Sequence, residues 1–277
     1  MFRQWYTLAI LVLIYIPVAI DATVLHVAVP SLTMALEASG NELLWISDIY
    51  SLVMAGMVLP MGALGDRIGY KRLTLIGSKL FGIASLAAAF SSDASQLIAA
   101  RALLAVGAAM IVPATLAGIR STFNNERERG IALGIWVAVG AGGAAFGPLV
   151  GGILLEHYYW GSVFLINVPI IALVLLFTAV FIPRQPVQRA QTLNLTQALM
   201  LIAAILLLVL AAKTSLKVNA DPLKALGAAI GGALLMTLFI RSQLRARAPM
   251  IDLTLFTHRI ILTGVVMALT EIGRAHV

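Results

Sequence analysis

The sequence predicts an all-α membrane protein whose helices cross the bilayer many times. Of its 277 residues, 61% are hydrophobic and only 11% are charged, and the mean hydropathy is +0.98. A soluble domain has about half apolar and about a quarter charged residues, so it has no interior large enough for this much apolar surface. The apolar residues also form long runs separated by short polar connections, which is the pattern of transmembrane helices.

Eight complete apolar segments have the roughly 17–25 residues that a helix needs to cross the hydrocarbon core. We expect them at 7–29, 43–65, 73–91, 96–119, 131–155, 162–182, 193–212 and 223–241. A ninth segment begins near Arg259 and stops where the chain ends. The first segment is too long for a cleaved signal peptide, because its apolar character continues to Val29.

The basic residues predict the orientation of these segments. Thirteen of the nineteen Lys and Arg residues lie at the N-terminus or in connections on its side: Arg3, Arg67, Lys71, Arg72, Arg120, Arg127, Arg129, Arg184, Arg189, Arg241, Arg245, Arg247 and Arg259. The opposite side holds only Lys213, Lys217 and Lys224, all in one loop. Since basic residues accumulate on the cytoplasmic side, we expect a cytoplasmic N-terminus. The net charge of +7 therefore reflects topology rather than nucleic-acid binding.

Sequence signatures of catalysis and cofactor binding are missing from the chain. It has no Cys, and its four His are scattered without the spacing of metal ligands. It contains no Walker A loop, serine nucleophile elbow or HExxH motif. The glycine-rich stretch 140–145 lies inside an apolar segment rather than after a strand, so it does not predict a dinucleotide site. We expect no enzymatic activity, no cofactor and no metal.

Ionisable residues inside the apolar segments are the clearest functional signal, since each costs about 2.5–3.5 kcal/mol at the centre of a helix. Asp21 lies deepest, and we expect it to bind and release a proton. Arg101 lies about one turn into its segment and carries a fixed charge that suits a permanent partner. Asp48 either faces a polar cavity or reaches the outer surface, while Lys79 is expected to extend to the cytoplasmic surface.

A repeated glycine pattern marks the segment 131–155. The pattern consists of Gly134, Gly143, Gly147, Pro148, Gly151 and Gly152. Gly143, Gly147 and Gly151 recur every four residues and form a ridge of small residues that lets another helix approach closely. Pro148 removes one helical hydrogen bond and favours a kink. Single glycine pairs are common in ordinary helix packing, but the full spacing is more specific and predicts a kinked, closely packed helix.

The connection 62–72 combines glycines with charges. Its characteristic residues are Gly62, Asp66, Arg67, Gly69, Lys71 and Arg72. The glycines permit a tight cytoplasmic turn. A loop that only sets topology needs the cations alone, so Asp66 among them predicts a charge relay that locks one conformation.

Taken together, these residues resemble the major facilitator superfamily. The connection 62–72 is similar to the family signature G-x-L-x-D-R-x-G-x-K-R, with Tyr70 at a position where Arg is usual. The stretch 97–109 resembles the helix 4 motif built on Arg101. The glycine pattern of 131–155 matches that of the drug:proton antiporters of the superfamily, which its symporters generally lack.

Two further stretches resemble the fourteen-helix branch of that superfamily. Residues 21–30 are similar to its helix 1 motif, with His26 in place of the usual Asn. Residues 45–50 look like the subgroup that exports quaternary ammonium compounds and viologens. The resemblance covers residues 5 to about 270 and implies two six-helix bundles joined by two extra helices.

The resemblance implies a proton-coupled multidrug antiporter that exports lipophilic and quaternary cations, including viologens, cationic dyes and biocides. In such a protein Asp21 couples the proton or cation and Arg101 takes part in proton transfer, while the glycine pattern helps to close the pathway. Candidates for the substrate pathway are His26, Asp48 and Tyr50. The partners implied are the lipid bilayer, protons and small lipophilic cations, without nucleic acid. The resemblance also implies a location in the bacterial inner membrane, and the full-length protein is expected to be a monomer. A proton symporter for a small nutrient and a non-transporting membrane scaffold stay open as alternatives.

The resemblance also bears on how the chain is divided. A member of this branch has five or six more helices, so we expect this chain to be an N-terminal fragment, truncated in the ninth helix and inactive alone. The expected parts are a six-helix bundle at 1–182, two linker helices at 183–241 and the start of a second bundle at 242–270. Residues 271–277 interrupt the ninth segment with charge, and we expect them to be an artefactual tail.

Overall fold

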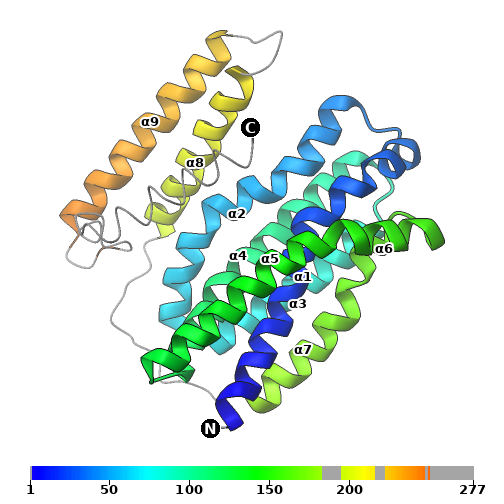
Figure 1. The fold of residues 1–277 in the computed structure, drawn as a ribbon. Coiled ribbons are helices and arrows are strands. Elements are labelled where there is room, and N and C mark those ends of the chain that lie inside the picture. The colour runs from blue at the N-terminus through cyan, green and yellow to red at the C-terminus, as the bar shows by residue number, and fades with distance from the viewer. Residues whose placement is uncertain (1, 183–194, 216–221, 247–248, 250–277) are drawn as a thin grey trace.

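The computed structural model describes residues 2–182, 195–215, 222–246 and 249. In these ranges the chain forms helices and no strand (Figure 1), which confirms the predicted all-α class. The helices are α1 (Phe2–Leu36), α2 (Gly40–Ile68), α3 (Tyr70–Ala89), α4 (Ala94–Thr122), α5 (Glu126–His157), α6 (Ser162–Leu165), α7 (Asn167–Phe181), α8 (Leu195–Ser215) and α9 (Pro222–Arg245).

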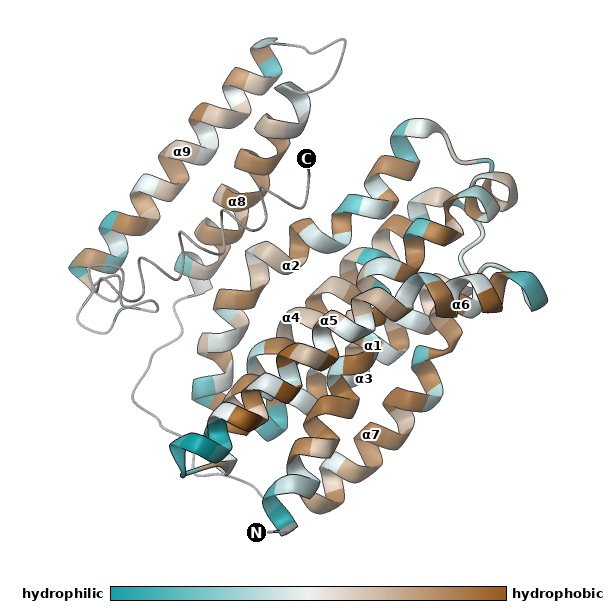
Figure 2. Cartoon of the chain, viewed as in Figure 1, coloured by the Kyte–Doolittle hydropathy of each residue, from teal (hydrophilic) through white to brown (hydrophobic). Residues whose placement is uncertain are grey.

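Seven spans in the described part of the chain are long and apolar enough to cross a membrane, with α6 and α7 together making one of them. Apolar residues extend along the helices and polar ones gather at their ends (Figure 2). The predicted segment 193–212 corresponds to α8, whose apolar part, Thr196–Ala212, is shorter than a full span. The boundary expected at 183, the ninth segment and the expected tail 271–277 lie outside the described residues.

The sixth predicted span, 162–182, is not one continuous helix. It forms α6 and α7, which meet at Ile166. Pro169 explains the interruption, because it has no N–H to donate to the carbonyl of Leu165 four positions earlier. Other helices are longer than their apolar segments, since backbone hydrogen bonds continue beyond the residues that hydropathy identifies.

Polar side chains determine where several helices begin. Ser39 accepts a hydrogen bond from the backbone N–H of Glu42, and the Glu42 carboxylate accepts one from the Ser39 N–H at 2.9 Å, which together form a capping box before α2. Asp93 accepts from the Gln96 N–H at 2.9 Å before α4. Asn125 caps α5 in the same way. These residues satisfy N–H groups that a helix terminus leaves unpaired.

The helices α1 to α7 pack into one bundle, and α8 and α9 form a hairpin that contacts it through α2 (Figure 1). Glycines permit the closest approaches. A Cβ on Gly107 of α4 would lie 2.9 Å from the Cβ of Phe81 on α3. On α2, Gly56 faces Ile202 of α8, whose Cα would lie 3.5 Å from a Cβ at that position.

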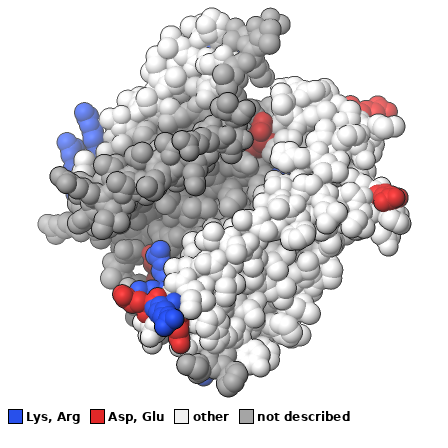
Figure 3. Space-filling view, in the orientation of Figure 1, with Lys and Arg blue, Asp and Glu red and all other residues white. Residues whose placement is uncertain are grey.

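One end of the bundle brings together the connections that the sequence assigned to the cytoplasm. The Gln4 side chain donates to the carbonyl of Thr122 at 3.1 Å, which ties the start of α1 to the end of α4. Lys71 Nζ donates to the carbonyls of Ala179 and Ile182, which ties the start of α3 to the end of α7. In the view of Figure 3 most charged side chains lie near the ends of the helices, and the described surface between them carries few.

Candidate functional site

A buried ion pair lies at the centre of the candidate site. Arg101 of α4 donates from Nη1 to Asp21 Oδ2 of α1 at 2.9 Å. Asp21 is 0% exposed and Arg101 1% exposed. Two buried charges are tolerated in an apolar bundle only when each has a partner. The two ionisable residues that the sequence marked independently therefore form one unit.

The cluster around this pair draws on further helices. Arg101 Nε donates to the carbonyl of Ile46 on α2 at 3.2 Å, and its guanidinium lies 4.7 Å from the ring centroid of Tyr50. In this cation–π contact the negative face of the Tyr50 ring attracts the guanidinium cation. The side chain of Asn167 on α7 lies next to Asp21. Asp21 Oδ1 nevertheless accepts no hydrogen bond of good geometry from a described residue.

The structure brings only part of the predicted substrate pathway into this cluster. Tyr50 belongs to it, and its buried hydroxyl has no hydrogen-bond partner among the described residues. His26 is exposed on α1, and Asp48 is half-buried on α2. Asn167 is the member that our sequence reasoning missed. An amide two positions before Pro169 in an apolar segment was the available signal.

The glycine ridge of α5 packs against α1, as its spacing predicts. A Cβ on Gly143 would lie 2.6 Å from the Cβ of Ala19, and one on Gly151 would lie 2.9 Å from a methyl carbon of Val24. A Cβ on Gly147 would collide with the hydroxyl of Thr23. That hydroxyl donates to the carbonyl of Ala144 on α5 at 2.8 Å, a bond that requires this close approach.

An aromatic pair extends the same α1–α5 contact. The rings of Tyr15 on α1 and Trp136 on α5 are stacked, with centroids 4.2 Å apart and an interplanar angle of 10°. Trp136 Nε1 also donates to the Thr115 hydroxyl of α4 at 3.1 Å. The other two glycines of the motif, Gly134 and Gly152, have no atom within 4 Å of an added Cβ. They do not pack within the described part of the chain, and α5 continues as one helix through Pro148.

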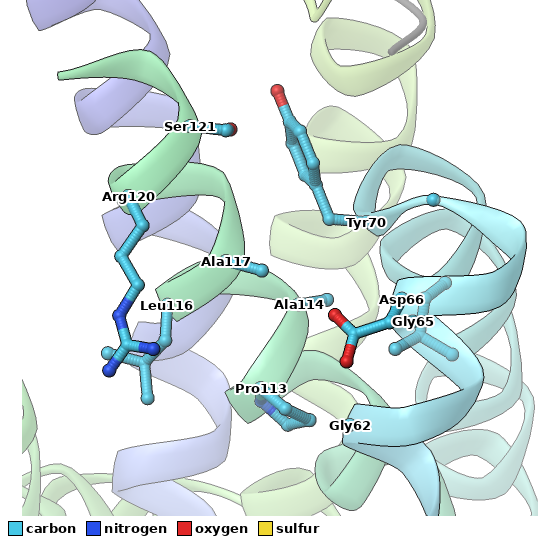
Figure 4. Close-up of a pocket in the computed structure, with 12 residues that line it drawn as sticks. Gly62, Gly65, Asp66, Tyr70, Pro113, Ala114, Leu116, Ala117, Arg120 and Ser121 are labelled. Atoms are coloured by element: carbon cyan, nitrogen blue, oxygen red, sulfur yellow. The ribbon is translucent and has the colours of Figure 1, made fainter. Parts of the chain in front are cut away.

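The turn between α2 and α3 borders a cleft of about 550 Å³ (Figure 4). Gly69 forms this turn with a φ of +87°, a conformation that favours glycine. Asp66 of α2 and Arg120 of α4 line opposite walls of the cleft. Arg120 is the cation whose charge acts on Asp66. Gly62 lies in the same wall as Asp66 and faces Pro113.

The predicted charge relay is not formed in this conformation. No ion pair joins Asp66 to Arg67, Lys71 or Arg72 within the described residues, where the ion pairs are Arg101–Asp21 and Arg129–Glu126. Lys71 instead donates to the carbonyls at the end of α7. Arg67 and Arg72 are exposed. The relay, with Asp66 as a conformational lock, stays a prediction.

The chain is similar to a known protein family and to several curated proteins. The model of the Major Facilitator Superfamily matches residues 11–273. The methyl viologen resistance protein SmvA of Salmonella typhimurium is 70% identical over 270 residues, which are 98% of this chain and 54% of that protein. The multidrug efflux pump LfrA of Mycolicibacterium smegmatis is 40% identical over 257 residues, covering 92% and 50% of the two chains. The puromycin resistance protein pur8 of Streptomyces alboniger is 32% identical over 258 residues, covering 93% and 51%.

The chain spans about half the length of the curated relatives it matches. The family model covers nearly all of this chain, and its members are membrane transporters rather than enzymes. The apolar helices of the structure agree with that assignment. On this evidence the chain is a multi-pass bacterial membrane protein that belongs to the Major Facilitator Superfamily.

Proposed function

We propose that this chain provides the proton-handling bundle of a multidrug antiporter, which exports lipophilic and quaternary cations in exchange for protons. The observation that carries the proposal is the Asp21–Arg101 pair. An ionisable residue buried at membrane depth is energetically expensive, and such residues mark ion and proton pathways. The names of the relatives support export of drugs, and one of them names methyl viologen, a quaternary dication.

The geometry suggests how protonation is linked to a change of conformation. With Asp21 ionised, the pair is stable and holds α1 against α4. Protonation removes the negative charge and leaves the Arg101 cation with the Ile46 carbonyl and the Tyr50 ring. Breaking a buried pair in this way costs about 3–5 kcal/mol. Proton binding therefore favours another arrangement of the helices, in which the Arg101 charge is better accommodated.

A substrate cation acts on the same equilibrium from the opposite direction. Asp21 is fully buried in the described conformation, so a drug has no direct access to its carboxylate. Exchange therefore requires a second conformation in which the pair has opened and the carboxylate faces the substrate. A proton and a cation then compete for one negative charge, which makes their binding mutually exclusive.

The proposed setting is the bacterial inner membrane, with the N-terminus in the cytoplasm. The basic residues of the connections at one end of the bundle support this orientation. The monomeric state expected for the complete protein stays a prediction.

Asp21→Asn tests the coupling role, since it keeps the size of the side chain but removes its charge. The variant is made in a chimera in which this chain replaces the matching first part of SmvA. Efflux of a cationic dye from vesicles energised by a pH gradient is expected to fall to background. Glu156→Gln, at an exposed position near the end of α5, is the matched control and should retain efflux. Normal pH-driven efflux by Asp21→Asn, with equal amounts of inserted protein, contradicts the proposal.

A further inference from the structure

The facing surfaces of α3 and α7 carry polar side chains, of which only Asn167 belongs to the ion-pair cluster. Thr74, Ser78 and Ser85 lie on α3, and Asn167 and Thr178 lie on α7, all at most 1% exposed. Within each helix they are separated by 4, 7 or 11 residues, which places them on one helical face. Burying so many polar groups in a membrane bundle is costly unless they have hydrogen-bond partners.

Three contacts along the interface show how the two helices pair. They join Ser85 to Asn167, Gly82 to Ile171, and Lys71 to Ala179. Residue numbers fall along α3 as they rise along α7, so the helices are antiparallel. This register places Thr74 opposite Thr178, with Ser78 one turn further into the bundle.

The hydroxyl oxygens of Thr74, Ser78 and Thr178 have no hydrogen-bond partner among the described residues. A buried polar group left without a partner costs about 1–3 kcal/mol. Where two polar groups lie too far apart for a direct bond, an ordered water molecule is the usual bridge. Three such hydroxyls on facing positions of two helices therefore form a site suited to water.

This hydroxyl site lies in line with the ion pair. Beyond it, Ser85 accepts a hydrogen bond from Asn167 at 3.4 Å, and Asn167 lies next to Asp21. In the other direction the interface ends at Lys71, at the end of the bundle that collects the basic connections. Lys71 lies fourteen positions before Ser85 on α3, a distance of about 21 Å at 1.5 Å per residue. Polar groups thus occur from the ion pair to one end of the bundle.

An apolar stretch interrupts this line of polar groups. By the register of the two helices, Phe81 and Ile171 lie at the level between the Ser85–Asn167 bond and the hydroxyl site, and both are at most 2% exposed. Gly82 lets Ile171 approach, since its Cβ would lie 3.0 Å from a methyl carbon of Ile171. Short apolar constrictions of this kind stop conduction until they become hydrated.

We propose that the α3–α7 interface binds ordered water at Thr74, Ser78 and Thr178 and is the route by which Asp21 exchanges its proton with the side of the membrane where Lys71 lies. The proton leaves the Asp21 carboxyl, which becomes a carboxylate, and each water or hydroxyl along the route accepts one proton and passes on another. The last water releases the proton to the solvent on the Lys71 side, so Asp21 changes its protonation and the relay groups do not. Phe81 and Ile171 separate to admit water when the ion pair opens. The water site stands by itself, and the role of the route rests on the proposed function of Asp21.

Radiolytic footprinting of the whole chain in lipid nanodiscs tests the water site. Hydroxyl radicals formed from bound water label side chains beside it, so Phe81 and Val174 are expected to be labelled although both are fully buried. The double variant Ser78→Ala/Thr178→Val should lower this labelling severalfold. Thr115→Val is the matched control, because the Thr115 hydroxyl is buried but already has partners in Val112 and Trp136. Protection of Phe81 in the parent, or unchanged labelling in the double variant, overturns the proposal.

The route itself is tested by transport in the SmvA chimera. The double variant is expected to slow proton-driven dye efflux severalfold and to leave dye binding unchanged. Ile171→Ala, which shortens the apolar stretch, should let protons leak without substrate. Efflux at the parental rate in the double variant, when labelling has been lost, shows that the water is not the route. Normal pH-driven efflux by the Asp21→Asn variant would instead contradict the proposed function of Asp21. Footprinting would still show whether water is bound at Thr74, Ser78 and Thr178.

Discussion

Asp21 and Arg101 are 80 positions apart in the chain and 2.9 Å apart in the bundle. Their pairing explains why two charges are tolerated where each alone would be expensive. Arg is better suited than Lys to this position, because its planar group reaches the carboxylate, the Ile46 carbonyl and the Tyr50 ring at once. The Arg101 guanidinium is thus held by three groups, which are the Asp21 carboxylate, the Ile46 carbonyl and the Tyr50 ring.

We predict a large interaction energy between the charges of Asp21 and Arg101. Arg101→Gln leaves Asp21 buried without its cation and is expected to lower the free energy of unfolding by about 3–5 kcal/mol. Adding Asp21→Asn removes the uncompensated charge and should recover most of that loss. Thermal unfolding of the purified chain in detergent measures both effects. Losses that simply add in the double variant would show that the pair carries no interaction energy.

Outside the ion pair, α1 and α5 approach each other closely along the glycine ridge. The glycines of α5 leave room where α1 passes, because they have no side chains. Tyr15, Ala19 and Thr23 of α1 occupy this room. The hydrogen bond from Thr23 to the Ala144 carbonyl forms only at this separation. Close backbone packing of this kind gives van der Waals contact without a hydrophobic driving force, as membrane helices require.

Some glycines of α5 contact α1 and others face open space, and we expect mutations in the two groups to affect stability differently. Gly147→Ala puts a methyl group against the Thr23 hydroxyl and the Ile20 carbonyl, so it should lower the melting temperature and break the bond to Ala144. Gly152→Ala meets open space and is the matched control. It should leave the melting temperature unchanged or raise it, since Ala is favoured over Gly in a helix by about 1 kcal/mol. Equal melting temperatures for the two variants would rule out the ridge as a packing surface.

As a whole, the described molecule is one helix bundle with a two-helix hairpin attached to α2 (Figure 1). Large apolar side chains on α5, among them Val137, Phe146, Leu149 and Ile153, stay more than half exposed. Transporters of this architecture place their substrate site between two bundles that rock about it. The ion pair lies inside a single bundle, so proton binding needs only the helices of this bundle, while passage of a substrate also needs a second one.

This separation predicts different behaviour for the chain alone and for the chimera. The chain alone should insert in the membrane and keep the Asp21–Arg101 pair, but it should not export a cationic dye. The chimera with the remaining part of SmvA should restore export. Resistance to methyl viologen in cells measures both, with equal expression checked by immunoblot. Resistance conferred by residues 1–277 alone would contradict the prediction.

The sequence by itself determined the membrane helices and the superfamily, and it marked Asp21 and Arg101 as candidate functional residues. These features depend on local hydropathy and on the cost of a single charge in lipid, both of which are properties of short stretches. It also predicted the α5 ridge, because a spacing of four residues places glycines on one helical face.

Only the tertiary structure decided which partners these residues meet. The pairing of Asp21 with Arg101, the place of Asn167 beside them and the different surroundings of Gly147 and Gly152 all depend on contacts between distant parts of the chain. The same holds for Asp66, which shares a cleft with Arg120 rather than an ion pair with its neighbours in sequence. Spacing along a helix shows which residues share a face, but the packing of helices decides what that face touches.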